Sequence, residues 1–372
     1  MSQVHVARRD RLRDRCAAAG DVAVLVSRPA NVRYLTGSPA AGAALLLTPG
    51  GQDVLLTLPS SHPHGDGGRA RPSAEELPTV ELSTVDADPV VAAAARAVDA
   101  GVGTLLVEEH HLTVARHRAL ADAAPRLRLA DLGGAVEQQR LVKDEEEIAA
   151  LRVAAEITDQ ALSELLESIL VGRTERHLAL ELDRRLVDHG ADGPAFPTLV
   201  ATGRNSGLAR HTPTERRVEE GDFLTICFGA RYQGYGCRIG RTFVIGTAPA
   251  TWQIELYDLV FAAQRAGREA LAPGAEYRAV DHAARQVLHA AGYGDALGAH
   301  VGHGVGLEID EDPRLCPTAV GKLEARVPVT VEPGVHLPGR GGVRIDDTLV
   351  VRPQADGGPE LLTITTKELL AL

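Results

Sequence analysis

The chain has 372 residues, enough for two domains that each bury a hydrophobic core. Its formal net charge of −11 at pH 7 argues against nucleic acid or an anionic membrane surface as a partner. Apolar runs stay shorter than the roughly 18 residues of a membrane helix, and residues 1–15 are too charged for a signal peptide. Four cysteines without a CxxC motif suit free thiols, so we expect a cytoplasmic protein without a membrane partner.

Residues 1–140 are predicted to form a small α/β domain. An Ala-rich segment between Pro89 and Ala100 suits a helix. Short apolar runs have the length of strands and occupy residues 22–26, 43–47, 54–58 and 104–107.

Two polar stretches of this first domain are assigned to its surface. Arginines near the N-terminus alternate with Asp10 and Asp14, which predicts a solvated helix face; they are Arg8, Arg9, Arg11, Arg13 and Arg15. Residues 60–78 are rich in Pro, Gly, Ser and His and predict a flexible loop. We expect four histidines to be surface residues without a site: His62, His64, His110 and His111.

Residues 141–372 form the predicted second domain. Asp144 can cap a helix with Glu147 three residues later, as in a capping box, and apolar residues follow at helical spacing. The rest divides into two similar halves, each with helices followed by a hairpin. The first hairpin carries Cys227 and Arg238. The second hairpin carries Glu332 and Asp346.

Several segments of the second domain, in their order and spacing, resemble the Xaa-Pro peptidases. These are aminopeptidase P, prolidase and their metal-free relative creatinase. The segments are residues 203–213, 224–243, 301–313, 331–334 and 342–347. Residues 28–37 and 140–148 also resemble the N-terminal domain and the junction of that family. The resemblance implies a pita-bread α/β domain behind a smaller, creatinase-type α/β domain.

The resemblance also implies a metal site, which this chain matches only in part. The family binds two metal ions through Asp, Asp, His, Glu and Glu. His303 and Glu332 occupy the His and first Glu positions, and Asp346 replaces the second Glu. The two Asp positions hold Cys227 and Arg238.

Arg238 is the substitution that most opposes a metal. Two divalent ions ~3.5–4 Å apart activate a bridging water, and hard carboxylates neutralise them. Cys227 could bind zinc as a thiolate, but Arg238 is permanently cationic and accepts no hydrogen bonds. Like unit charges at ~4 Å cost about 4 kcal/mol at an effective dielectric of ~20. We expect no metal, and Arg238 turned inward onto Glu332 or Asp346.

The proton-handling positions differ as well. Arg210 aligns with a family histidine, and a one-residue loop shift would put His211 there instead. A second family histidine is Asp310 here. Candidate catalytic residues are therefore His303, Glu332 and His211. Candidate ligand-binding residues are Arg210, Arg238 and Asp310.

Blander interpretations of these residues stay open. His303 can be a satisfied core histidine, Glu332 a turn residue, and Cys227 a small buried apolar residue. Arg210 can reach solvent, or it can pair with Glu215 or Glu219.

Three functions follow as alternatives. The first is a catalytically degenerate homologue that keeps a pocket for a peptide or small molecule and needs no cofactor. The second is a metal-independent, creatinase-like hydrolase of a C–N bond. The third is a true Xaa-Pro metallopeptidase with an altered site that binds Mn, Co or Zn. The resemblance also suggests a homodimer.

Overall fold

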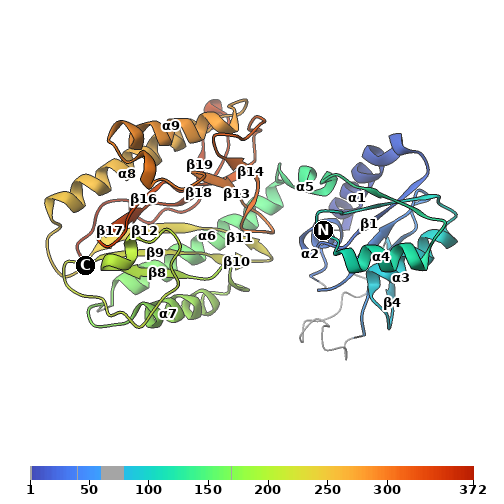
Figure 1. Cartoon of the computed structure of the whole chain (residues 1–372), viewed down its shortest axis with the longest axis horizontal. Coiled ribbons are helices and arrows are strands. Elements are labelled where there is room, and N and C mark those ends of the chain that lie inside the picture. Colours follow the sequence, from blue (N-terminus) through green and yellow to red (C-terminus); the bar gives the residue numbers. More distant parts are fainter. Residues whose placement is uncertain (1, 40, 60–78, 169) are drawn as a thin grey trace. The chain divides into compact units, whose positions relative to one another are not determined.

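The computed structural model describes residues 2–39, 41–59, 79–168 and 170–372 (Figure 1). The chain divides into two compact units, Met1–Arg140 and Leu141–Leu372. The predicted loop at residues 60–78, with His62 and His64, lies outside the described residues. Within the described residues, no helix is both long enough and apolar enough to cross a membrane.

In the described part of the first unit, six strands form one sheet in the order β4-β3-β2-β1-β5-β6. The strands are β1 (Val22–Val26), β2 (Ala44–Leu47), β3 (Asp53–Thr57), β4 (Val80–Thr84), β5 (Thr104–Val107) and β6 (Arg128–Asp131). The helices are α1 (Ser2–Cys16), α2 (Pro29–Thr36), α3 (Pro89–Asp99), α4 (Val114–Ala123) and α5 (Ala135–Arg140). The four strands and the helix predicted from apolar runs are present within one residue of their expected bounds. Apolar side chains of α3 and α4 bury themselves against the sheet and form the core of this unit.

The prediction that the arginines of α1 are solvated is wrong for two of them. Arg8 and Arg9 are only 3% and 2% exposed. Arg9 donates from Nε to Asp53 Oδ2 at 2.8 Å, and the Arg8 guanidinium carbon lies 4.0 Å from the ring centre of Tyr34. A buried guanidinium must keep its hydrogen bonds and a counter-charge. Because both come from residues far along the chain, the local alternation of charges could not reveal this burial.

The second unit places its strands between a pair of helices on each side (Figure 1). The helices are α6 (Glu145–Leu166), α7 (Glu175–Asp188), α8 (Thr251–Glu269) and α9 (Tyr277–Ala290). The strands of the first half are β7 (Gly193–Pro194), β8 (Leu199–Thr202), β9 (Phe223–Phe228), β10 (Ala230–Tyr232), β11 (Tyr235–Gly236) and β12 (Ile239–Val244). Those of the second half are β13 (Gly302–Gly304), β14 (Glu311–Leu315), β15 (Pro328–Val331), β16 (Gly334–Leu337), β17 (Gly341–Arg344), β18 (Asp347–Val350) and β19 (Glu360–Leu361). The predicted capping box of Asp144 and Glu147 begins α6.

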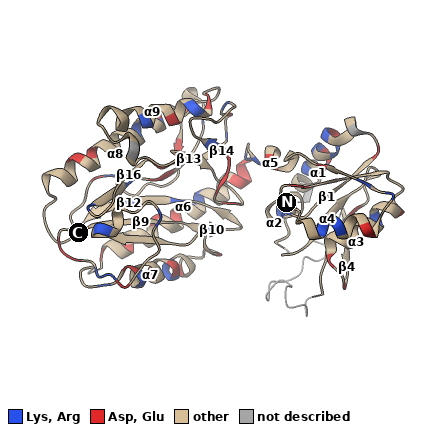
Figure 2. Ribbon diagram, viewed as in Figure 1, with Lys and Arg blue, Asp and Glu red and all other residues tan. Residues whose placement is uncertain are grey.

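Charged residues of both signs alternate along the outer helices of this unit (Figure 2). Arg184 pairs with Asp188 one turn later on α7, and Arg285 pairs with Asp281 on α9. The Arg184–Asp188 pair is exposed and contributes little to stability, whereas Asp281 is buried and Arg285 supplies its counter-charge.

The two predicted hairpins meet through one close backbone contact. In the first, β9 and β12 pair so that Cys227 lies opposite Gly240; in the second, β15 pairs with β18. Gly240 and Asp346 then exchange backbone hydrogen bonds at 3.1 and 3.0 Å. A Cβ on Gly240 would lie 2.5 Å from the Asp346 carboxyl carbon, so this approach requires glycine.

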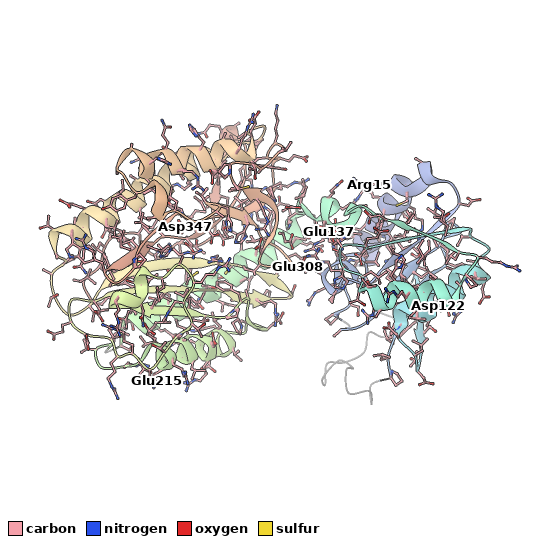
Figure 3. The ribbon with its side chains drawn as sticks, viewed as in Figure 1. Arg15, Asp122, Glu137, Glu215, Glu308 and Asp347 are labelled. Atoms are coloured by element: carbon pink, nitrogen blue, oxygen red, sulfur yellow. The ribbon has the colours of Figure 1, made fainter. Side chains whose placement is uncertain are left out.

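A buried ion pair anchors the second hairpin beside this contact. Arg241 donates from Nη2 to Asp347 Oδ1 at 2.8 Å, and from Nη1 to the Asp346 carbonyl oxygen at 2.8 Å. Gln264 of α8 donates to the other Asp347 oxygen at 2.6 Å. Figure 3 shows Asp347 inside the unit, whereas Glu215 lies at its edge. These bonds fix the backbone that carries Asp346.

All four cysteines are free thiols, as expected. Cys227 and Cys237 have different neighbours: the Cys227 thiol contacts Asp346, and the Cys237 thiol contacts Thr158 of α6. Cys227 lies on β9, whereas Cys237 lies between β11 and β12.

Candidate functional site

A cavity of about 570 Å³ opens between the two hairpins of the second unit. Its apolar lining includes Phe196, Leu199, Val301 and Ile309. Its charged lining includes Arg210, Arg238, Asp310, Glu332 and Arg344. Four histidines also line it: His211, His300, His303 and His336. A concave site of this volume, part apolar and part charged, has the dimensions of a small-molecule site.

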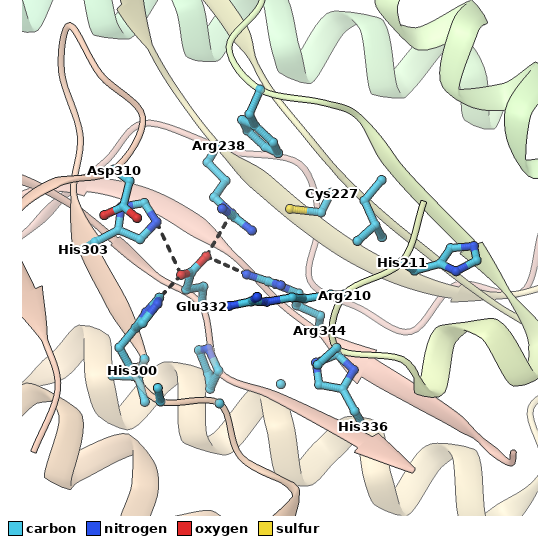
Figure 4. A pocket seen from close by; sticks show the side chains of 18 of the residues that line it. Arg210, His211, Cys227, Arg238, His300, His303, Asp310, Glu332, His336 and Arg344 are labelled. Atoms are coloured by element: carbon cyan, nitrogen blue, oxygen red, sulfur yellow. Dashed lines mark hydrogen bonds and ion pairs between the residues drawn. The ribbon is translucent and has the colours of Figure 1, made fainter. Parts of the chain in front are cut away.

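Two carboxylates and two guanidiniums form an ion cluster, of which Figure 4 shows Glu332, Arg238 and Arg344 at the cavity. Arg238 Nε lies 2.9 Å from Glu332 Oε2 and 3.0 Å from Asp346 Oδ2. Arg344 reaches the same two residues, with Nη2 2.7 Å from Glu332 Oε2 and Nε 2.8 Å from Asp346 Oδ1. The expected inward turn of Arg238 is therefore present, and we call these four residues the ion cluster.

The second oxygen of Glu332 faces two imidazoles (Figure 4). His303 Nε2 lies 3.4 Å and His300 Nδ1 3.5 Å from Glu332 Oε1. The Nδ1 atom of His303 lies 3.0 Å from the carbonyl oxygen of Gly304. An Nδ1–H that donates to that carbonyl leaves Nε2 as the nitrogen that faces the carboxylate.

The charges of the ion cluster reinforce one another. Burial by itself raises the pKa of Glu332, but Arg238 and Arg344 outweigh it and hold that pKa at about 2. Burial lowers the pKa of each guanidinium, yet the nearby acidic groups raise the pKa of Arg344, and the pKa of Arg238, above the ordinary value. Glu332, Arg238 and Arg344 therefore stay charged near neutral pH.

Cys227 is a neutral member of the same site. Its side chain is buried and donates from Sγ to Asp346 Oδ2 at 3.2 Å. Burial raises the pKa of this thiol to about 12, and the neighbouring carboxylates add to the effect against Arg238 and Arg344. A thiol with this pKa is protonated at pH 7 and is a poor nucleophile.

His211 lines the cavity, but its ring contacts Glu175. Its Nε2 lies 2.8 Å from Glu175 Oε2, a carboxylate that also accepts from the backbone N–H groups of Thr202 and Thr214. Figure 4 shows His211 away from Glu332 and His303. Arg210 and His211 both line the cavity, and the one-residue loop shift stays a prediction.

Asp310 lies at the rim of the cavity, where Arg314 pairs with it at 3.1 Å. The side chains of both residues are about half exposed. Solvent screens an ion pair of this kind, so Asp310 adds little charge to the cavity.

Comparison with known proteins places this chain in a family. The model of metallopeptidase family M24 matches residues 149–353, and that of the creatinase/prolidase N-terminal domain matches residues 8–142. The chain belongs to metallopeptidase family M24. Its M24 domain has the pita-bread α/β fold and follows a creatinase-type N-terminal domain, as the motifs predicted.

Curated relatives and solved structures agree with this assignment. The Xaa-Pro dipeptidase of Pyrococcus furiosus is 32% identical over 93% of this chain and 94% of its own length. The structure of an Xaa-Pro dipeptidase from Bacillus anthracis is 30% identical, with a TM-score of 0.90 over 99% of this chain and 100% of that one. An X-Pro aminopeptidase from Thermotoga maritima is 28% identical, with a TM-score of 0.84 over 98% and 100%.

Three residues of this M24 site were missed in the sequence. Arg344 precedes Asp346 by two residues in extended backbone, so both point to one face; this spacing was a readable signal. His336 follows Glu332 by four residues on β16, and its Nδ1 lies 3.4 Å from the carbonyl oxygen of Ser206. His300 lies in a loop, whose path has no local sequence signal.

Proposed function

We propose that this M24 homologue does not work as a dinuclear metallopeptidase and keeps its cavity to bind a peptide or small molecule. The ion cluster is the observation that carries the proposal. Its two guanidiniums occupy both Asp346 oxygens and Glu332 Oε2 at 2.7–3.0 Å. These are the oxygens that a pair of divalent ions would need.

The residues of the site do not fit two divalent ions. A cation entering between Glu332 and Asp346 would meet Arg238 within a few ångströms, and a unit charge opposes a divalent ion there by about 8 kcal/mol at an effective dielectric of ~20. Cys227 offers a protonated thiol where the resemblance expects a carboxylate. Among the described residues, no group of three or more His, Cys, Asp or Glu side chains is arranged to hold a metal.

Metal-independent hydrolysis of a C–N bond is the second candidate. It draws support from the two imidazoles that face Glu332 Oε1 at 3.4 and 3.5 Å. A histidine beside a carboxylate can move a proton to or from a substrate without a metal. His211 would not take part, because Glu175 holds its ring.

One assay separates these functions from a metallopeptidase with an altered site. The dipeptide Ala-Pro is a suitable probe, since relatives are named Xaa-Pro dipeptidase. We expect no hydrolysis with added Mn²⁺ or Co²⁺. Hydrolysis that persists in a chelator and disappears in Glu332→Gln would favour the metal-independent candidate. Hydrolysis that requires Mn²⁺ or Co²⁺ would overturn the proposal. The expected cytoplasmic location and homodimer stay predictions.

A further inference from the structure

One wall of the cavity is a short segment without regular structure. Ala209, Arg210, His211 and Thr212 line the cavity, and residues 208–214 belong to neither a helix nor a strand. Figure 4 shows Arg210 directed into the cavity and His211 away from Glu332 and His303. Arg210 and Thr212 are exposed, yet the His211 side chain is only 6% exposed. The His211 ring is therefore the part of this segment that is packed into the unit.

A single polar contact holds the middle of this segment. Residues 209–213 make no backbone hydrogen bond to any other described residue. Their one hydrogen bond within the described part of the chain joins His211 Nε2 to Glu175 Oε2 at 2.8 Å. Stretches with few hydrogen bonds and much exposed surface open locally at a low cost in free energy. Residues 209–213 therefore depend on His211 to stay in place.

Arg210 adds no second contact to this segment. The sequence left Glu215 and Glu219 open as its partners, but both pair with other arginines. Glu215 lies 3.2 Å from Arg176, and Glu219 lies 3.3 Å from Arg216. Among the described residues, Arg210 forms no hydrogen bond or ion pair. The alternative in which Arg210 pairs with Glu215 or Glu219 is therefore wrong.

The buried carboxylate of Glu175 does not depend on His211. Its Oε1 accepts from the backbone N–H of Thr202 at 2.8 Å and from Asn205 Nδ2 at 2.9 Å. Its Oε2 accepts from the backbone N–H and the hydroxyl of Thr214 at 2.9 and 2.6 Å. Burial by itself raises the pKa of Glu175, but the hydrogen bonds from Thr214, Thr202 and Asn205 outweigh it and lower that pKa. When the His211 ring leaves, these other donors keep the carboxylate satisfied.

We propose that residues 209–213 form a flap over the cavity and that the contact of His211 with Glu175 is its latch. Release of the latch frees the middle of the flap while its ends stay anchored. At one end Leu208 donates from its backbone N–H to the Asn205 carbonyl oxygen at 3.0 Å, and at the other Thr214 holds Glu175. Opening of the flap widens the cavity, and closing completes the wall around a ligand. This inference rests on the proposed function, because it describes how a ligand enters the same cavity.

Limited proteolysis of the full chain with trypsin tests the latch, with cleavage after Arg210 followed by mass spectrometry. Local opening precedes cleavage, so the rate follows the population of the open flap. We expect His211→Ala to raise this rate about 10- to 100-fold, the range for a lost hydrogen bond to a charged group. His211→Gln should restore most of the native rate, because its amide N–H can donate to Glu175. Cleavage after Arg265, which requires unfolding of α8, should not change.

His189→Ala is the matched control, since His189 Nε2 lies 3.0 Å from Glu164 and this histidine does not line the cavity. In a second arm, excess Ala-Pro should slow cleavage after Arg210 in the native chain, because the flap lines the occupied cavity.

The outcomes separate the flap from the ligand pocket. An unchanged rate after Arg210 in His211→Ala, an equal rise after Arg265, or an equal rise in His189→Ala would overturn the flap, whether or not Ala-Pro protects. A rise confined to Arg210 in His211→Ala, without protection by Ala-Pro, would support the latch and contradict the proposed pocket for a peptide.

Discussion

The guanidinium of Arg238 lies within 3.0 Å of an oxygen from each of Glu332 and Asp346. It supplies the positive charge that these two buried carboxylates require, and so it can hold them together as a metal ion would. It cannot polarise a carbonyl group as a Lewis acid or lower the pKa of a bound water. Arg238 can therefore stabilise the site without supplying the hydrolytic chemistry of a metal ion.

Removing Arg238 should destabilise the protein. In Arg238→Met, Glu332 and Asp346 share Arg344 as their remaining cation, and breaking a buried ion pair costs about 3–5 kcal/mol. We expect the free energy of unfolding at pH 7 to fall by about 3 kcal/mol. Urea denaturation followed by circular dichroism measures it. Arg210→Met, at an exposed and unpaired arginine, should change it by less than about 0.5 kcal/mol. Equal stabilities for the two variants would contradict the role of the ion cluster.

Glu332 should give the protein a distinct sensitivity to acid. The pKa of Glu332 is about 2 in the folded protein against an ordinary 4.5. Its stabilisation is complete above pH 4.5 and is lost as the pH falls toward 2. The shift corresponds to about 3 kcal/mol. Between pH 4.5 and 2, the free energy of unfolding should fall more steeply for the native chain than for Glu332→Gln. Parallel curves over that range would show that Arg238 and Arg344 do not depress this pKa.

The Cys227 thiol should be inert. Burial raises its pKa to about 12, so roughly one molecule in ten thousand carries the reactive thiolate at pH 8. Iodoacetamide at pH 8 should label Cys316, the least buried cysteine, long before Cys227. Peptide mapping by mass spectrometry measures the rates, and denatured protein should label at every cysteine. Labelling of Cys227 at the rate of Cys316 would mean that the cavity opens.

At the scale of elements, two hairpins position the site by their backbones. Gly302 lies on β13 next to His303, and a Cβ there would lie 2.0 Å from the backbone oxygen of Thr330 on β15. Gly302→Ala must therefore push the strands apart, and we expect a loss of about 3 kcal/mol in the free energy of unfolding. At Gly298 a Cβ would make only an ordinary contact at 3.7 Å, so Gly298→Ala is the control. Similar melting temperatures for the two variants would contradict this role of β13.

At this scale, part of the site could be predicted from the sequence and part could not. The motifs predicted which positions meet, because each lies at the start or end of a hairpin strand and strand alternation fixes its face. The inward direction of the Arg238 side chain could be predicted from charge alone. The burial of Arg8 and Arg9, the tie of His211 to Glu175 and the approach of His300 depend on long-range packing, for which the local sequence carries no signal.

At the scale of the whole molecule, the chain has the fold of its M24 relatives. The chain superposes on an Xaa-Pro dipeptidase structure with a TM-score of 0.90. Restoring carboxylates with Cys227→Asp and Arg238→Asp should therefore return affinity for Mn²⁺, because the backbone around both positions is already in place. We expect no peptidase activity with it, since the resemblance implies a proton-handling histidine at the position of Arg210. Ala-Pro hydrolysis by the double variant in Mn²⁺, without Arg210→His, would refute this.

The metal content of the purified chain tests the central claim most directly. The native chain and the double variant Cys227→Asp/Arg238→Asp would be incubated with Mn²⁺, Co²⁺ and Zn²⁺, desalted and analysed by inductively coupled plasma mass spectrometry. The ion cluster predicts far less than one equivalent in the native chain and a clear gain in the double variant. One or more equivalents in the native chain, lost on Glu332→Gln, would show that a metal displaces Arg238 and would contradict the account.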